Sequence, residues 1–250
     1  MYLPDFDEDR EERMVAALDA GVYRVALPNI DADSMLMVKE MMRAYPNQVI
    51  GMMGLHPSSV KEDYKVNLNS IKTELDSGNY CAVGEIGIDL YWDKTYIAEQ
   101  KEAFKIQLGW AKEMKLPVAI HSRDSFAEIC EVLDEVYDGS LSGVFHCFTG
   151  NEIEMEKALS YKNFYLGIGG VLTFKNSGLD SVIAKADLNR LVLETDAPYL
   201  TPHPFRGKRN ETAYTKIVAR KLAEVFDISL EELARITTAN ANNLFKMSGH

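Results

Sequence analysis

The 250-residue sequence predicts an α/β protein, and within that class a (β/α)8 TIM barrel rather than an open doubly wound sheet. Two observations support this prediction. Short apolar runs alternate with longer helical patterns roughly every 25 to 35 residues, as in parallel α/β folds. Polar residues also gather at the C-terminal ends of the apolar runs, and a barrel brings such ends together in one ring where its active sites lie.

The strand candidates are continuous apolar runs rather than alternating polar and apolar residues, which is typical of parallel strands covered by helices. In chain order they are residues 23–30, 49–57, 81–89, 117–123, 142–148, 164–170 and 190–200. Helical patterns occupy residues 8–20, 33–45, 96–115, 125–137, 151–161 and 178–186, and two more follow residue 212. Because no Gly-, Ser- or Pro-rich linker interrupts this alternation, the sequence predicts one domain over residues 1–250.

The composition excludes several classes of protein. A formal net charge of −11 argues against a protein that coats nucleic acid, so any contact with a polyanion must be local or metal-assisted. No apolar run approaches the roughly 20 residues that span a bilayer, and the acidic N-terminus does not resemble a signal peptide. Three scattered cysteines without a CxxC motif predict a reducing, cytoplasmic setting. We expect no membrane association and no obligatory protein partner.

Four polar residues at predicted strand ends make a metal site the leading hypothesis: Glu85, His121, His146 and Asp196. Imidazole and carboxylate groups together form the ligand set of hydrolytic Zn, Mn or Mg sites. One such histidine alone is usually a hydrogen-bonded core residue, and one such carboxylate usually has a salt-bridge partner. Four of them at equivalent strand ends favour metal binding, and a cation would also compensate the charge of Glu85 inside an apolar strand.

Six sequence blocks occur in order along the predicted strands and loops. They are GLHP (54–57), VGEIGIDLYW (83–92), PVAIHSRD (117–124), GVFHCFTG (143–150), VLETDAPYLTP (192–202) and RGKRNE (206–211). Together they resemble the signature blocks of the TatD family of metal-dependent deoxyribonucleases, from about residue 3 to the C-terminus. The resemblance implies a TIM barrel that hydrolyses DNA, as an exonuclease, with two divalent ions. The ligand types do not distinguish Mg, Mn and Zn.

The resemblance also implies a role for each residue. Glu85 corresponds to a carboxylate that bridges two ions, and His121 and His146 complete the ligands of one of them. Asp196 binds the other ion and orients or deprotonates the attacking water. His56 resembles a family residue that contacts the scissile phosphate, and the structural alternative is a cap at the start of the next turn.

Further candidates surround these blocks. Glu194 is expected to hold a ligand imidazole, because it lies two residues before the metal-binding aspartate and on the same side of the strand. Arg206, Lys208 and Arg209 form the densest basic cluster and are expected to contact the DNA backbone. The alternative for this cluster is a solvated loop paired with acidic surface groups.

Beyond the third strand candidate, Tyr91 and Trp92 could stack on a base, although aromatic residues at a barrel rim more often serve packing. Arg123 follows His121 by two residues and could either clamp substrate or pair with a neighbouring carboxylate.

The family's first strand, which carries a His-x-His pair, has no counterpart in this sequence. The segment LPDFDED (3–9) matches what normally follows that strand, and Met1 falls at the position of a leucine. We therefore expect a barrel whose first strand is missing from the given chain, with codons for that strand upstream of the start; a genuine truncation is the alternative. The loss of two imidazoles makes the second metal site doubtful.

Two other functions remain open. A metal-dependent amide, ester or lactone hydrolase would use the same ligands, although the basic RGKRN segment favours a phosphate substrate. A catalytically impaired paralogue that acts as a binding protein would account for the missing histidines, and metal titration would separate it from the enzymes.

Overall fold

A computed structural model describes residues 1–247 and has the predicted alternation of parallel strands and helices. The described residues contain seven strands, each inside a predicted stretch. They are β1 (Val25–Leu27), β2 (Val49–Met53), β3 (Ala82–Asp89), β4 (Val118–Arg123), β5 (Gly143–Phe145), β6 (Phe164–Ile168) and β7 (Leu191–Leu193).

The contacts within the chain divide it into two compact units. The central unit comprises residues 26–146 and 161–164, and the terminal unit comprises residues 1–25, residues 147–160 and the chain from residue 165 onward. The central unit contains α2 (Ser34–Ala44), the 3-10 turn η2 (Pro57–Ser59), α3 (Tyr64–Ser77), α4 (Ile97–Met114) and α5 (Phe126–Val136). The terminal unit contains η1 (Pro4–Phe6), α1 (Arg10–Asp19), α6 (Glu152–Ser160), η3 (Gly170–Thr173), α7 (Leu179–Ile183), η4 (Leu188–Arg190), η5 (Thr212–Tyr214), α8 (Thr215–Phe226) and α9 (Leu230–Phe245).

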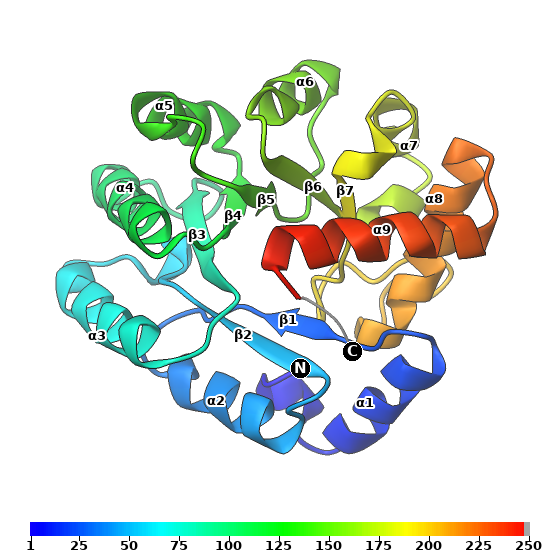
Figure 1. Ribbon diagram of the computed structural model, residues 1–250, viewed down its shortest axis with the longest axis horizontal. Helices are drawn as coiled ribbons and strands as arrows, with labels where there is room; N and C mark the ends of the chain where they lie inside the picture. Colours follow the sequence, from blue (N-terminus) through cyan, green and yellow to red (C-terminus); the bar gives the residue numbers. More distant parts are fainter. Residues whose placement is uncertain (248–250) are drawn as a thin grey trace. The chain divides into compact units, whose positions relative to one another are not determined.

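Strands β2 to β5 of the central unit pair in parallel and in chain order. All eight residues of β3 are buried, so the carboxylates of Glu85 and Asp89 lie among apolar neighbours. Helices α3, α4 and α5 follow successive strands and lie along the outer side of β2 to β5 (Figure 1). The pairing places Gly87 opposite His121, so that the polar segments of β3 and β4 are neighbours.

Gly87 permits the close approach of β3 and β4 at this point. Its φ of +143° is rarely adopted by residues with a side chain, and a Cβ atom there would lie 2.0 Å from the backbone oxygen of His121. Any other residue would therefore push the two strands apart where their polar side chains meet.

Two buried glutamines of α4 satisfy backbone groups beside the strand ends. The Gln107 side chain accepts a hydrogen bond from Leu55 N at 2.7 Å and donates to Leu55 O at 3.2 Å. Gln100 accepts from Asp89 N at 2.8 Å. Because unpaired buried backbone groups are costly, these contacts fix the segments that follow β2 and end β3.

In the terminal unit, β6 pairs in parallel with β7, and α8 and α9 bury apolar faces that include Val218, Leu222, Leu233 and Leu244. Helix α9 begins at a cap in which the Ser229 side chain accepts a hydrogen bond from Glu232 N at 3.1 Å. None of the helices in residues 1–247 is both long and apolar enough to cross a membrane.

Candidate metal centre

The sequence predicted Glu85 at the C-terminal end of its strand. In the structure it lies inside strand β3 instead. The strand continues to Asp89, and its register with β4 shifts between Val83 and Ile86. At this irregular point Asn29, which follows β1, exchanges hydrogen bonds with β3: Asn29 N donates to Gly84 O and Glu85 N donates to Asn29 O, both at 3.2 Å. Glu85 is only 8% exposed, so its carboxylate requires compensation within the protein.

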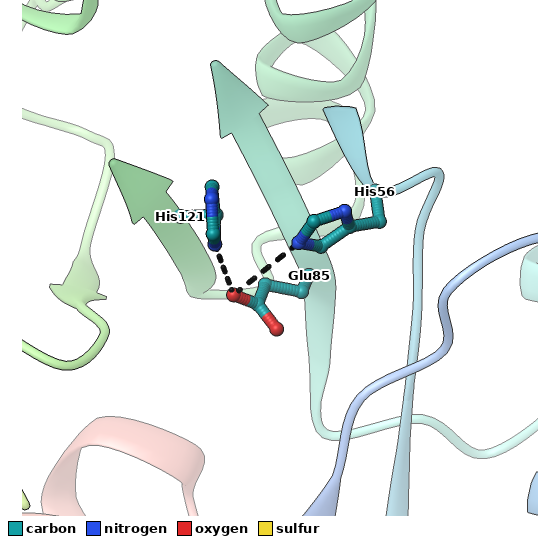
Figure 2. Close-up of side chains that lie close together, drawn as sticks. All are labelled: His56, Glu85 and His121. Carbon is teal, nitrogen blue, oxygen red and sulfur yellow. Dashed lines mark hydrogen bonds and ion pairs between the residues drawn. The ribbon is translucent and has the colours of Figure 1, made fainter. Parts of the chain in front are cut away.

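Three imidazoles surround this carboxylate in the central unit. His121 Nδ1 lies 3.0 Å from Glu85 Oε1, His146 Nε2 lies 3.6 Å from it, and His56 Nε2 lies 3.9 Å from it. Figure 2 shows the rings of His56 and His121 directed at the same carboxylate oxygen. His146 is placed by its backbone N–H, which donates to Ile120 O of β4 at 2.9 Å. The structure thus brings together the three predicted residues of this unit, Glu85, His121 and His146, with His56 beside them.

The charge of Glu85 is met by imidazoles alone. Within residues 1–247, no lysine or arginine forms an ion pair with Glu85. Burial by itself would raise the pKa of Glu85, but the charge of His146, the hydrogen bond and charge of His121 and the charge of His56 hold that pKa well below its usual range. Glu85 is therefore an ionised carboxylate whose partners can also exist as neutral groups with a free lone pair.

His56 combines the two roles considered from the sequence. It precedes η2, and its Nδ1 accepts a hydrogen bond from Ser58 N at 3.1 Å, which is a cap. Burial lowers the pKa of His56 to about 4, so the ring is neutral at pH 7. A neutral ring that accepts at Nδ1 carries its proton on Nε2, so His56 presents an N–H donor toward Glu85 rather than a lone pair.

His121 lies between two carboxylates. Its Nδ1 faces Glu85, and its Nε2 lies 2.9 Å from Oδ2 of Asp89. Burial would lower the pKa of His121, but the hydrogen bonds to Asp89 and Glu85 outweigh it and raise the pKa to about 9. A metal-bound histidine usually donates its other N–H to a carboxylate, which fixes the tautomer and the ring orientation. Asp89 is placed to do this for His121.

Asp89 was quoted in the sequence motif but received no role there. The signal that could have found it is its spacing from Glu85, since residues four apart in a strand lie on the same face. The adjacent strand then places His121 between the two carboxylates.

These residues fit a divalent cation. Carboxylate and imidazole are suitable donors for Zn or Mn, and Glu85, His121 and His56 offer ligand atoms within 4.8 Å of one another. Because His56 Nε2 carries a proton when Ser58 N–H occupies Nδ1, His146 is the better third donor beside Glu85 and His121. The chemistry such an ion supplies is Lewis-acid activation of a substrate for hydrolysis.

The predicted residues Asp196 and Glu194 belong to the terminal unit and follow β7. Both are partly buried, and Asp196 O accepts a hydrogen bond from Tyr199 N at 2.6 Å. The Glu194 side chain accepts from Cys147 N at 2.7 Å, the residue that follows His146 in the chain. Their proposed roles therefore rest on the family pattern and on these local contacts.

The basic cluster of the terminal unit divides into two kinds of residue. The guanidinium of Arg209 forms two hydrogen bonds to the carboxylate of Asp9, at 2.9 and 2.6 Å. The guanidinium of Arg206 instead lies over the Phe174 ring, 3.6 Å from its centroid, and Lys208 Nζ lies 5.7 Å from the Phe205 centroid. We assign Arg209 to an ion-pair network and keep Arg206 and Lys208 as candidates for phosphate contact.

The family assignment follows from sequence similarity over almost the whole chain. Residues 1–246 match the family described as TatD related DNase. The chain belongs to the TatD family. It is 38% identical to the uncharacterized metal-dependent hydrolase YabD of Bacillus subtilis, over 97% of this chain and 95% of the relative. It is 29% identical to the 3'-5' ssDNA/RNA exonuclease TatD of Pectobacterium parmentieri, again over 97% of this chain and 95% of the relative.

The crystal structure of YjjV, a TatD homologue from Escherichia coli, superposes with a TM-score of 0.91 at 30% identity, covering 98% of this chain and 94% of that one. This similarity confirms the predicted α/β fold of the TIM-barrel class. The protein is thus a metal-dependent hydrolase of the TatD family.

Proposed function

We propose that this TatD-family hydrolase is a deoxyribonuclease that cleaves phosphodiester bonds of DNA with the aid of divalent metal ions, and that it acts as an exonuclease. One observation supports the proposal most: a buried carboxylate, Glu85, is surrounded by imidazoles and by no permanent cation within residues 1–247. The names of related proteins agree with it, since a relative is named as a 3'-5' ssDNA/RNA exonuclease.

Each residue has a proposed task. Glu85, His121 and His146 would hold one ion in the central unit, and Asp196 would bind a metal ion as well. Asp196 orients the attacking water and accepts its proton. His56 donates its Nε2–H to a phosphate oxygen, a role consistent with the cap formed at Nδ1.

Three further residues complete the proposal. Glu194 supports the segment that carries His146 through its hydrogen bond to the next residue, Cys147. Arg206 and Lys208 contact the substrate backbone, where local cations are needed because the whole protein carries a charge of −11. Its three cysteines are scattered and form no CxxC motif, and on that basis we propose the cytoplasm as its location.

The proposal is tested by incubating the purified chain with end-labelled single-stranded DNA, duplex DNA and RNA in Mg²⁺, Mn²⁺ or Zn²⁺. A panel of carboxylic esters, lactones and amides runs in parallel. We expect metal-dependent release of nucleotides from DNA, abolished by chelation. Turnover of a carboxylic ester or amide without any cleavage of DNA would replace the nuclease by the alternative hydrolase.

Asp196→Asn tests the residue proposed to handle the water. The change is nearly isosteric but removes the charge that binds an ion or accepts a proton, so hydrolysis should fall by at least about 100-fold. Asp19→Asn is the matched control, because Asp19 is an exposed aspartate of α1 in the same unit. Turnover of Asp196→Asn within a few-fold of the parent protein would contradict the role.

A further inference from the structure

Three side chains with flat faces gather beyond the candidate metal centre of the central unit. Tyr91 and Trp92 follow β3 and are 49% and 78% exposed. Their rings meet edge to face, with centroids 4.6 Å apart. The guanidinium carbon of Arg123 lies 3.8 Å from the Tyr91 centroid and 5.5 Å from the Trp92 centroid. These three residues form what we call the stacking platform. Packing was the more common expectation for the two aromatic residues, but Trp92 is left largely open.

The stacking platform is tied to the metal centre by backbone and side-chain contacts. Leu90 N donates to Arg123 O at 2.9 Å, which joins the loop after β3 to the end of β4. Tyr91 N donates to Oδ1 of Asp89 at 3.0 Å, and the other oxygen of this carboxylate lies 2.9 Å from His121 Nε2. One carboxylate therefore holds both a candidate metal ligand and the start of the platform.

The distance between platform and metal centre suits neighbouring parts of one ligand. Arg123 follows His121 by two residues in β4, so both side chains leave the same face of the strand, about 7 Å apart along it. A ligand with a phosphodiester near His121 thus has its adjacent group within reach of the platform.

We propose that the stacking platform binds one unpaired base of a single-stranded nucleic acid, next to the phosphodiester held at the metal centre. This inference rests on the proposed nuclease function and adds to it a site for the base. Aromatic side chains bind bases by stacking with little sequence preference, and arginine adds a cation–π contribution. A base within a duplex has both faces covered by its neighbours, so the platform selects an unpaired one.

The charge of the protein supports a stacking mechanism. At a net charge of −11 the overall field repels a polyanion, so binding must draw on local contacts. Stacking does not depend on net charge. Within residues 1–247 the guanidinium of Arg123 forms no hydrogen bond or ion pair, so its charge can also reach a phosphate beside the stacked base.

The test measures the affinity of the metal-loaded protein for single-stranded oligodeoxythymidylate with phosphorothioate linkages, which resist hydrolysis. A matched series carries an abasic residue at each position in turn. For the parent protein we expect one abasic position to weaken binding by about 5- to 150-fold, the range for loss of one stacked base. Trp92→Ala should show a loss of this size on the intact strand and no further loss on the abasic one, while Trp92→Phe keeps most of the affinity.

Tyr23→Ala is the matched control, because Tyr23 is 73% exposed and precedes a strand rather than following one. Its Kd should equal that of the parent. Equal affinity of Trp92→Ala and parent for the intact strand, or an equal loss on intact and abasic strands, would overturn the proposal. If the protein cleaves DNA but an abasic position does not weaken binding, the base-binding proposal is refuted and the nuclease proposal stands. If an abasic position weakens binding but the protein does not cleave DNA, the nuclease proposal is refuted and the base-binding proposal stands.

Discussion

The central and terminal units each hold a carboxylate cluster, and they compensate its charge in different ways. In the central unit Glu85 is met by imidazoles, of which His121 is nearest at 3.0 Å. In the terminal unit Asp9 is met by the guanidinium of Arg209 at 2.6 Å, and a second arginine joins the network. One cluster thus depends on groups that can lose a proton, and the other on groups that cannot.

This difference separates a structural cluster from one suited to a ligand. A guanidinium remains charged at any pH a folded protein meets, so the ion pair of Asp9 is complete as it stands. It connects the N-terminal segment to residues 209–211, since Arg13 also pairs with Glu211 at 3.0 Å. An imidazole can release its proton and offer a lone pair, so the charge of Glu85 can be met by a metal ion instead.

The largest expected effect comes from removing the central charge. Glu85→Gln keeps the shape of the side chain but removes the one anion that His56, His121 and His146 all face in the described residues. Loss of an outer partner of a metal ligand costs about 10- to 100-fold, and Glu85 is proposed as the ligand itself, so hydrolysis should fall by more than about 100-fold. Metal content of the purified variant, measured by mass spectrometry, should fall with it.

Glu211→Gln is the corresponding change in the terminal unit. It removes a partner of Arg13 and should lower the melting temperature without changing metal content. If Glu85→Gln bound metal as the parent does while Glu211→Gln did not, the contrast between the two clusters would be reversed.

The next effect concerns the histidine that caps η2. His56→Ala removes the proposed Nε2–H donor, and the loss of one such donor to a developing negative charge costs about 100-fold in kcat. Metal content should stay at the parent value, because Ser58 N–H occupies Nδ1 and leaves the proton on Nε2. A variant that loses metal together with activity would show that His56 is a ligand and that its tautomer differs.

The strands of this fold could be predicted because burial between helices imposes a continuous apolar run on each of them. The convergence of Glu85, His121 and His146 followed from the same argument, since they lie on β3, on β4 and directly after β5, which are neighbouring strands of the central unit. The predicted ends of the strands were less accurate than the predicted strands themselves. Strand β2 was predicted to include His56 but ends at Met53, because Leu55 N pairs with the Gln107 side chain and His56 caps the next turn.

Other features depend on contacts that spacing along the chain does not encode. The partner of Arg209 is Asp9, which lies 200 residues away in the sequence. The proton position of His56 depends on one backbone N–H, and the exposure of Trp92 depends on how the loop after β3 turns away from the core. Neither composition nor a sequence motif specifies these three-dimensional contacts.

A smaller effect should follow from the carboxylate behind His121. Asp89→Asn keeps a hydrogen-bonding group but removes the charge that fixes the ring, so metal affinity should fall by about 10- to 100-fold. Asp93→Asn is the control, because Asp93 lies in the loop that follows β3 and its side chain is 47% exposed. Isothermal titration with Zn²⁺ and Mn²⁺ measures both. Equal affinities for the two variants would show that His121 is oriented without Asp89.

The smallest effect tests the terminal cluster directly. Arg209→Gln breaks the double hydrogen bond to Asp9, so the melting temperature should fall by a few degrees while affinity for single-stranded DNA changes less than about twofold.

Arg206→Gln should weaken binding of single-stranded DNA and leave the melting temperature unchanged. Within residues 1–247 the guanidinium of Arg206 forms no ion pair and lies over the Phe174 ring. If it contacts one phosphate, its loss should reduce the slope of log K against log salt by about 0.7, the value for one contact on a single strand. Binding titrations at several salt concentrations measure that slope. A reduction of the same size in Arg209→Gln would mean that the ion pair with Asp9 opens when DNA binds. The cluster of Asp9 would then exchange its partner for a ligand, as proposed for the cluster of Glu85.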